Sequence, residues 1–371
     1  MSGAPPQLRL LMTTDAVGGV WTYAMDLARG LSARGVMTHL AVTGPSPSES
    51  QLAQAGGIDG LVLHDTGLPL DWMAAEPLAI RAAGKTIGTL ATALGVDLIH
   101  LNSPSLASAG GFDVPVLGAC HSCLATWWAA VHGGAMPPDF AWRSALLREG
   151  YLACDELVAP SLAFARATAE AHALARLPVA IHNGRSAVHQ DSGEPIEAMF
   201  TAGRLWDTGK NVAALDRVAR LLPFPVLAAG ALSGPEGSRA SFEHLDCVGV
   251  LDDAAMGAIW RGTPLYASPA LYEPFGLAVL EAAQAGCALV LTDMPSFREL
   301  WEGAALFIDW SDEDGAAQSI ESLMNDPMRR AALGSAARQR AERYGLDAMC
   351  DATLAQYKAL LAGTQRQASA A

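Results

Sequence analysis

The sequence predicts an α/β protein with two doubly wound parallel sheets in tandem. Short apolar runs that suit buried strands alternate along the chain with longer segments in which apolar residues recur at helical spacing. This alternation stops at the polar stretch 183–196, which contains two glycines and a proline, and then restarts. The chain has 371 residues, which is long for a single hydrophobic core. We therefore expect two domains, over residues 1–185 and 196–345.

The composition limits the class of protein and its partners. With 51% hydrophobic and 17% charged residues, the chain has enough apolar side chains to fold as a globular protein. Its net charge of −14 argues against nucleic acid as a partner. No apolar run reaches the ~18 residues of a membrane span, and the start has no signal-peptide pattern. We expect a cytoplasmic protein without an integral membrane segment, which leaves peripheral membrane contact open.

The first half of the chain is predicted to alternate between strands and helices. Strands are expected at 8–12, 39–43, 61–64, 97–101, 114–120, 156–159 and 178–182. Helices are expected after the Gly18-Gly19 turn, at 79–94 and at 161–175. The segment 125–152 carries three tryptophans, and it is either a helical pair packed on the sheet or an apolar patch that meets an acceptor.

Two features of this half lie at the carboxyl ends of strands, where parallel sheets bind ligands. Gly18 and Gly19 follow the first strand but do not form a G-x-G-x-x-G fingerprint. They either serve a tight turn or let a ligand approach the backbone closely. His121 is either a structural histidine or a catalytic or binding one. It stands between Cys120 and Cys123, whose thiols we expect to be free because no second cysteine pair has zinc spacing.

The second half repeats the alternation. Strands are expected at 198–203, 225–230, 246–250, 265–268, 288–291 and 305–308. Helices are expected at 212–221, 253–260, 277–285, 297–300, 312–324, 327–343 and 346–361, and the ten residues that follow are expected to be disordered.

The stretch PLYASPALYEPFGLAVLEAAQAG carries the clearest ligand-binding pattern. Its loop delivers the N–H groups of Phe275, Gly276 and Leu277 at a helix N-terminus, which favours an anion. Glu273 lies in the loop, and Glu281 lies roughly 6 Å beyond Leu277 along the helix axis. The two carboxylates either flank a bound phosphate, near a sugar and a ribose, or are a cap carboxylate and a solvated side chain.

A second cationic feature follows the strand at 198–203. Arg204 comes directly after it, and Lys210, one of only three lysines, comes six residues later. Both cations are expected at the sheet edge that holds the helix N-terminus described above. They either form a diphosphate site with that terminus or are two solvated loop cations.

Four segments together resemble the fourth family of retaining glycosyltransferases, which have the GT-B fold. EPFGLAVLEAAQAG is similar to the family's Glu–seven–Glu signature, and GRLWDTGKN is similar to its Arg–Lys motif. HNGR at 182–185 resembles its interdomain Asn-Gly, and TTDAVGGVWTYAMDLARGL resembles its N-terminal glycine loop. The four matches stand in the family's order and span residues 13–286.

The resemblance implies a fold and two substrates. Two Rossmann-like domains would face a cleft, with the acceptor on the N-terminal domain and a nucleotide sugar, UDP- or GDP-linked, on the C-terminal one. The helix at 346–362 would pack back on the first domain. The reaction would move a hexose, with retention, to a hydroxyl of a glycan, a lipid-linked or a small-molecule acceptor, without metal or cofactor. The alternatives are a GT-B sugar-phosphate epimerase or phosphorylase, and a non-catalytic nucleotide-sugar-binding protein.

The resemblance also implies roles for the candidate residues. Arg204 and Lys210 would neutralise the diphosphate, and Glu281 would hold the ribose. Glu273 and His121 would contact the donor sugar. These four residues other than Glu281 form the expected catalytic set. The other expected donor-binding residues, from the glycine loop, the loop bordering the base and the helix N-terminus, are Gly18, Gly19, Val250, Leu251, Phe275, Gly276 and Leu277.

Overall fold

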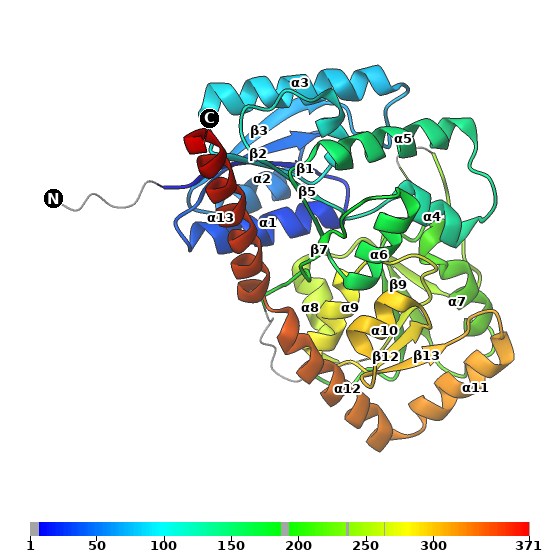
Figure 1. Ribbon diagram of the computed structural model, residues 1–371. Helices are drawn as coiled ribbons and strands as arrows, with labels where there is room; N and C mark the ends of the chain where they lie inside the picture. The colour runs from blue at the N-terminus through cyan, green and yellow to red at the C-terminus, as the bar shows by residue number, and fades with distance from the viewer. Residues whose placement is uncertain (1–6, 187–192, 235–236, 263, 371) are drawn as a thin grey trace. The chain divides into compact units, whose positions relative to one another are not determined.

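The computed structural model describes residues 7–186, 193–234, 237–262 and 264–370, and it shows an α/β protein (Figure 1). The chain forms two compact units. Unit 1 comprises the described parts of Met1–Ala129, Gly134–Gly184 and Leu346–Ala371, and unit 2 comprises those of Ala130–Gly133 and Arg185–Gly345. Each unit contains one parallel sheet, as predicted from the sequence.

The sheet of unit 1 has the strand order β3-β2-β1-β4-β5-β6-β7. Its strands are β1 (Arg9–Asp15), β2 (Met37–Thr43), β3 (Leu61–Leu68), β4 (Leu98–Leu101), β5 (Val116–Ala119), β6 (Glu156–Ala159) and β7 (Val179–Ala180). The order reverses at β1, where Met12 lies opposite Leu40 of β2 on one side and His100 of β4 on the other. The carboxyl ends of β1 and β4 are therefore the place where a sheet of this topology binds ligands.

Helices cover both faces of this sheet. They are α1 (Gly19–Ser32), α2 (Glu49–Gly56), α3 (Pro77–Leu94), α4 (Leu124–Val131), α5 (Pro138–Ala153), α6 (Leu162–Ala171) and α13 (Leu346–Ala370), with the 3-10 helix η1 (Pro104–Ala109). Successive side chains of β1 point to opposite faces, so Leu10 and Met12 join the core with α1 and α13, whereas Leu11 joins the core with α3. Figure 1 draws α13 in red beside α1.

The sheet of unit 2 has the order β10-β9-β8-β11-β12-β13, the order of dinucleotide-binding folds. Its strands are β8 (Met199–Ala202), β9 (Val226–Ala229), β10 (Asp246–Gly249), β11 (Leu265–Ser268), β12 (Leu289–Thr292) and β13 (Ala305–Ile308). The order reverses between β8 and β11, where Tyr266 lies opposite Phe200. The carboxyl ends of these two strands carry the predicted Arg–Lys and Glu–seven–Glu segments.

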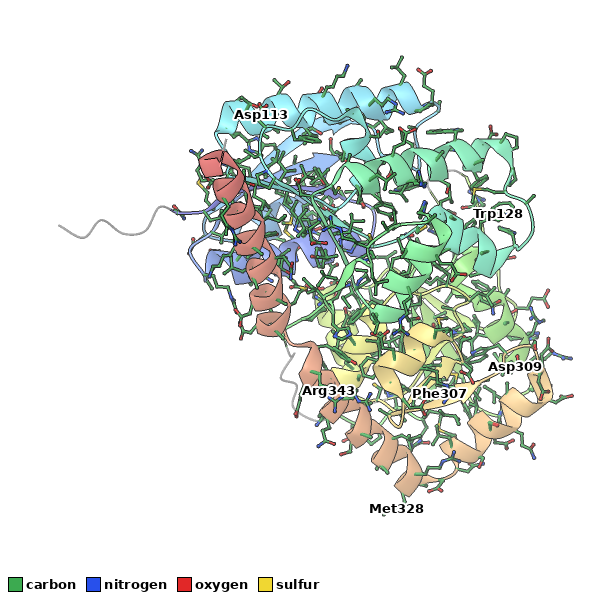
Figure 2. All side chains as sticks on the ribbon, viewed as in Figure 1. Asp113, Trp128, Phe307, Asp309, Met328 and Arg343 are labelled. Carbon is green, nitrogen blue, oxygen red and sulfur yellow. The ribbon has the colours of Figure 1, made fainter. Side chains whose placement is uncertain are left out.

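The helices of unit 2 also lie on both faces of its sheet. They are α7 (Val212–Ala219), α8 (Asp253–Arg261), α9 (Leu277–Ala285), α10 (Pro295–Trp301), α11 (Glu313–Met324) and α12 (Pro327–Ala341), with the 3-10 helices η2 (Thr208–Lys210) and η3 (Glu342–Tyr344). Leu265 and Ala267 of β11 face the core with α7 and α11, and Tyr266 faces the core with α9 and α10. Side chains fill the layers between sheet and helices in each unit (Figure 2).

Every strand predicted from the sequence is present, and the differences concern helices. The polar helix α2 was not predicted; its Ser48 forms a capping box with Gln51, but Ala55 is the helix residue that is buried. The segment 125–152 forms α4 and α5, as the helical-pair alternative expects. The expectation of a disordered tail is wrong, because α13 continues to Ala370 through a sequence rich in alanine and glutamine that lacks proline.

Candidate active site

The candidate site in unit 2 is formed by two loops that leave neighbouring strands. The strand order reverses between β8 and β11. The loop 203–211 follows β8 and the loop 269–276 follows β11. The two loops are joined where the N–H groups of Leu271 and Tyr272 donate to the carbonyl of Gly209 (2.9 and 3.2 Å). They are therefore held together at the edge of the sheet where ligands bind.

Lys210 and Glu273 meet in an ion pair across these loops. Both side chains are largely buried, at 24% and 14% exposed. The backbone carbonyl of Glu273 accepts a hydrogen bond from the Ser296 hydroxyl at the start of α10 (2.6 Å), which fixes the loop from a second side. A fixed cation and a fixed carboxylate thus stand directly before the N-terminus of α9.

The loop enters α9 through Phe275 and Gly276. Phe275 is buried, with its ring edge-on to Tyr344 at 5.7 Å between centroids. Gly276 has a φ of +90°, and a Cβ there would lie 3.1 Å from Cγ2 of Val279, so the entry into the helix requires glycine. The helix begins at Leu277, and the first N–H groups of a helix have no acceptor within it. Together with the helix dipole, they favour an anion at this point.

Glu281 lies one turn into α9, where its carboxylate forms an ion pair with Arg185. The carbonyl of Arg185 accepts a hydrogen bond from Nε2 of Gln284 in the same helix (3.2 Å). Glu281 and Glu273 both act on buried Tyr266, because burial and then these two carboxylates raise the pKa of the Tyr266 hydroxyl far above its usual value. The two carboxylates are therefore in the same neighbourhood, with β11 behind them.

Arg204 follows β8, and its guanidinium is held within its own loop. It donates to Asp207 Oδ2 (2.7 Å) and lies over the ring of Trp206 at 5.7 Å from the centroid. The other carboxylate oxygen of Asp207 accepts from the N–H of Gly209 (2.9 Å). The structure thus brings Lys210 and Glu273 into direct contact and connects Arg204 to them through the loop that it shares with Lys210.

Val250 and Leu251 lie at the same carboxyl edge of this sheet, after β10. Val250 is exposed, and Leu251 packs at the margin of the core beside α9. The N–H of Gly230, after β9, donates to the carbonyl of Gly249 (2.8 Å) and joins the two neighbouring loops. The position predicted for contact with a base is therefore accessible, on the far side of β9 from Lys210.

In unit 1, Gly18 and Gly19 stand between β1 and α1. Gly18 caps the helix with an extended backbone (φ −159°, ψ −151°), a conformation that any residue adopts, and Gly19 is the first helical residue. The carbonyl of Gly18 accepts from the N–H of Trp21 (3.1 Å). The backbone at Gly18 therefore does not explain the choice of glycine by a tight left-handed turn.

His121 follows β5 and is held by Asn102, the first residue after β4. Asn102 Nδ2 donates to the carbonyl of Thr13 on β1 (2.8 Å), so its Oδ1 is an acceptor. This oxygen lies 2.7 Å from His121 Nε2, which must carry the proton. His121 is the neutral tautomer with its lone pair on Nδ1, since burial lowers its pKa to about 4.

His121 also lines a small pocket at the carboxyl ends of β5, β6 and β7. The wall opposite includes Asn183 of the HNGR segment, and Tyr23 of α1 contacts the imidazole edge-on at 4.4 Å between centroids. The six cysteines are free, as predicted, and Cys123 Sγ lies 2.9 Å from His172 Nε2 in the core. His121 is therefore the member of the C-H-S-C segment that reaches a pocket.

The site includes residues that the sequence patterns did not single out. Arg185 and Asn102 each hold a predicted residue by its functional group. Arg185 stands in the HNGR segment, and Asn102 directly follows the predicted strand 97–101, so position after a strand was the available signal. Within the described residues, no group of three or more His, Cys, Asp or Glu side chains is placed to hold a metal ion. None of the described helices combines the length and apolarity that a membrane crossing needs.

Comparison with known families gives this arrangement an identity. A model described as Glycosyltransferase Family 4 matches residues 17–186, and one described as Glycosyl transferases group 1 matches residues 243–340. The chain belongs to glycosyltransferase family 4. The resemblance inferred from the four motifs is thus confirmed, and the enzyme is a glycosyltransferase.

Curated relatives are similar over different shares of this family 4 glycosyltransferase. The D-inositol 3-phosphate glycosyltransferase of Kineococcus radiotolerans is 25% identical over 93% of this chain and 91% of its own. The phosphatidyl-myo-inositol mannosyltransferase of Mycolicibacterium smegmatis is 35% identical, but the match covers only 27% of each chain.

Solved structures show the GT-B fold. The sucrose-phosphate synthase of Thermosynechococcus elongatus superposes with a TM-score of 0.77 and 17% identity, over 96% of this chain and all of the other. HepE of Anabaena, in complex with UDP and glucose, superposes with a TM-score of 0.70 and 16% identity, over 95% of this chain and all of the other.

Proposed function

We propose that this glycosyltransferase moves a hexose from a nucleotide-diphosphate sugar to a hydroxyl of an acceptor, with retention of the anomeric configuration and without a metal ion. The observation that carries the proposal is the Lys210–Glu273 ion pair before the N-terminus of α9. In this proposal the diphosphate binds at that terminus, and the C-terminal domain, residues 196–345, is the donor domain.

The chemistry explains why a cation and a helix N-terminus suit this reaction. Cleavage of the bond between the sugar and the diphosphate places negative charge on the leaving phosphate. Lys210, Arg204 and the N–H groups of Gly276 and Leu277 would stabilise that charge more in the transition state than in the ground state. These fixed charges would do what a divalent ion does in other transferases, so no metal or other cofactor is part of the proposal.

The remaining residues fall to the two ends of the donor. Glu281 is proposed to accept hydrogen bonds from the ribose, and Val250 and Leu251 to border the base. Glu273 is proposed to act at the transferred sugar. His121 would accept a hydrogen bond from a sugar hydroxyl through its Nδ1 lone pair.

For retention, we propose that the acceptor hydroxyl attacks the anomeric carbon from the face that the leaving phosphate occupies. The phosphate oxygen would take the hydroxyl proton as the bond to the sugar breaks. Gly19 is proposed to let the phosphate approach the backbone closely. The cytoplasmic location expected from the composition and the N-terminal sequence remains part of the proposal.

A donor screen tests this function. UDP-, GDP- and ADP-hexoses are added to the protein in EDTA, and the shift in unfolding temperature identifies the donor, since a ligand that binds the folded state stabilises it. Release of the nucleoside diphosphate is then measured with water, an inositol phosphate and a glucan as acceptors. Release in EDTA that added magnesium does not increase supports the proposal. No release with any donor, or release only after metal is added, contradicts it.

A further inference from the structure

Arg185 joins the beginning and the end of unit 2 to helix α9. Its N–H donates to the carbonyl of Tyr344 (3.2 Å), and the backbone pairs in parallel with Gly345. Its guanidinium binds the Glu281 carboxylate, and its carbonyl accepts from Gln284, almost one turn further along α9. Arg185 is therefore fixed at both its backbone and its side chain.

The same contacts reach the loop before α9. The ring of Tyr344 lies edge-on to Phe275, and its hydroxyl donates to the carbonyl of Leu300 (3.0 Å). Tyr344 thus contacts both the residue that precedes Gly276 and the backbone of Arg185. The position of Arg185 is tied to the segment that leads into the proposed phosphate site.

The Arg185–Glu281 pair is only partly open to solvent, with 29% and 20% of the side chains exposed. A carboxylate in such a position that loses its cation is left without compensation, close to the second carboxylate of Glu273. A charged, oriented carboxylate is also a stronger acceptor for a hydroxyl than a neutral group. Removal of Arg185 would therefore weaken what Glu281 does with a ligand.

We propose that Arg185 is a positioning residue that keeps the Glu281 carboxylate charged and aimed at the ribose hydroxyls of a nucleoside diphosphate. This inference rests on the proposed function, because it needs Glu281 to bind ribose. A residue that only anchors the chain would change the stability of unit 2 and leave the preference for ribose unaltered. A positioning residue changes that preference.

The experiment measures binding of UDP and GDP, and of their 2′,3′-dideoxy forms, by calorimetry. The variants are Arg185→Met, which removes the charge, and Arg185→Lys, which keeps it. Arg330→Ala is the matched control, since Arg330 forms a two-pronged pair with Glu197 elsewhere in unit 2 and is similarly buried. The unfolding temperature of each variant is recorded alongside.

We expect the wild type to prefer the ribose form by about 10-fold or more, which corresponds to a charge-assisted hydrogen bond. Arg185→Met should reduce the preference to about two-fold, Arg185→Lys should keep part of it, and Arg330→Ala should keep all of it. An unchanged preference in Arg185→Met, even with a lower unfolding temperature, would overturn the inference alone. If the wild type binds neither UDP nor GDP, the proposed donor site fails and this inference fails with it.

Discussion

Lys210 and Glu273 form an ion pair between two loops that leave adjacent strands, β8 and β11. The pair lies where the strand order of the sheet reverses, and it precedes the helix whose N-terminus is free to face an anion. In the ligand-free protein the Glu273 carboxylate compensates the charge of Lys210. A bound diphosphate would take that place, so binding exchanges one anion for another at a cation that is already in position.

Loss of either loop cation should lower turnover of the donor. Lys210→Ala and Arg204→Ala each remove a charge-assisted contact worth roughly 1.5–3 kcal/mol, or about 10- to 200-fold in rate. Steady-state release of the nucleoside diphosphate measures the effect. Arg217→Ala, which removes a surface pair with Glu313, is the control and should keep the wild-type rate. Wild-type turnover by Lys210→Ala, with the fold intact, would remove Lys210 from the diphosphate site.

The two carboxylates should fail in different ways when they are made neutral. Glu281→Gln should raise the donor KM and weaken binding of the bare nucleoside diphosphate, since its ribose contact is equal in ground and transition states. Glu273→Gln should lower kcat and spare the bare nucleotide, because charge changes near the sugar during the reaction. Calorimetry with the nucleotide and kinetics with the donor measure both effects. The reverse pattern would exchange the two roles.

Asn102 should control the pH dependence of the reaction through His121. In the wild type, His121 stays neutral above about pH 5, because burial lowers its pKa to about 4. Asn102→Asp places a carboxylate against Nε2, which raises the His121 pKa. Below the raised pKa both ring nitrogens carry protons and Nδ1 can no longer accept, so kcat/KM should fall as the pH is lowered.

The measurement is a profile of kcat/KM between pH 5.5 and 8 for the wild type and Asn102→Asp. Asn325→Asp, at the exposed end of α11, serves as the control for an added carboxylate. If Asn102→Asp keeps the wild-type profile while folding normally, His121 does not act through Nδ1.

Stability should fall as the pH drops from about 6.5 towards 4. His100 is fully buried with its Nδ1 2.6 Å from the hydroxyl of Tyr357, and burial, with His121 nearby, lowers its pKa to about 3. In this range the unfolded chain binds a proton at each such histidine and the folded chain does not. The free energy of unfolding therefore decreases by up to about 1.4 kcal/mol per pH unit for each histidine. Urea unfolding at several pH values should show a shallower slope for His100→Gln, and an equal slope would refute the assignment.

Gly230 should tolerate no side chain. Its φ is +142°, and a Cβ would lie 1.7 Å from the carbonyl oxygen of Gly203, the residue before Arg204. Gly230→Ala should cost at least about 3 kcal/mol, because the clash adds to the backbone penalty. Gly303→Ala tests the penalty alone, since Gly303 has a φ of +76° and open space around it, and it should cost about 1–2 kcal/mol. Equal losses in chemical denaturation would show that the contact yields.

Local punctuation explains why part of the structure could be predicted from the sequence. The bounds of β11 and α9, at 265–268 and 277–285, agree with the expected ones because prolines and glycines mark the loop between them. Alternating apolar runs predicted the other strands. The helix α2 was missed because its side chains are mostly exposed, so burial leaves no apolar period in its sequence.

The partners of the site residues could not be predicted, because they are brought together by the fold. Arg185 and Glu281 are 96 residues apart, and neither the HNGR segment nor the Glu–seven–Glu segment indicates the other. Asn102 holds His121 through a hydrogen bond that depends on its own contact with Thr13, 89 residues earlier. Sequence order places each residue at a sheet edge, but the side-chain contacts follow only from packing.

The configuration of the sugar in the product tests the central proposal most directly. An α-linked nucleotide-hexose that the donor screen identifies is incubated with the enzyme and an acceptor in EDTA, and the anomeric proton of the new glycoside is followed by NMR from the first turnovers. The proposal predicts an α-linked product, formed as the nucleoside diphosphate is released, at a rate that Lys210→Ala reduces at least about 10-fold. A β-linked product, or a rate that does not depend on Lys210, would contradict it.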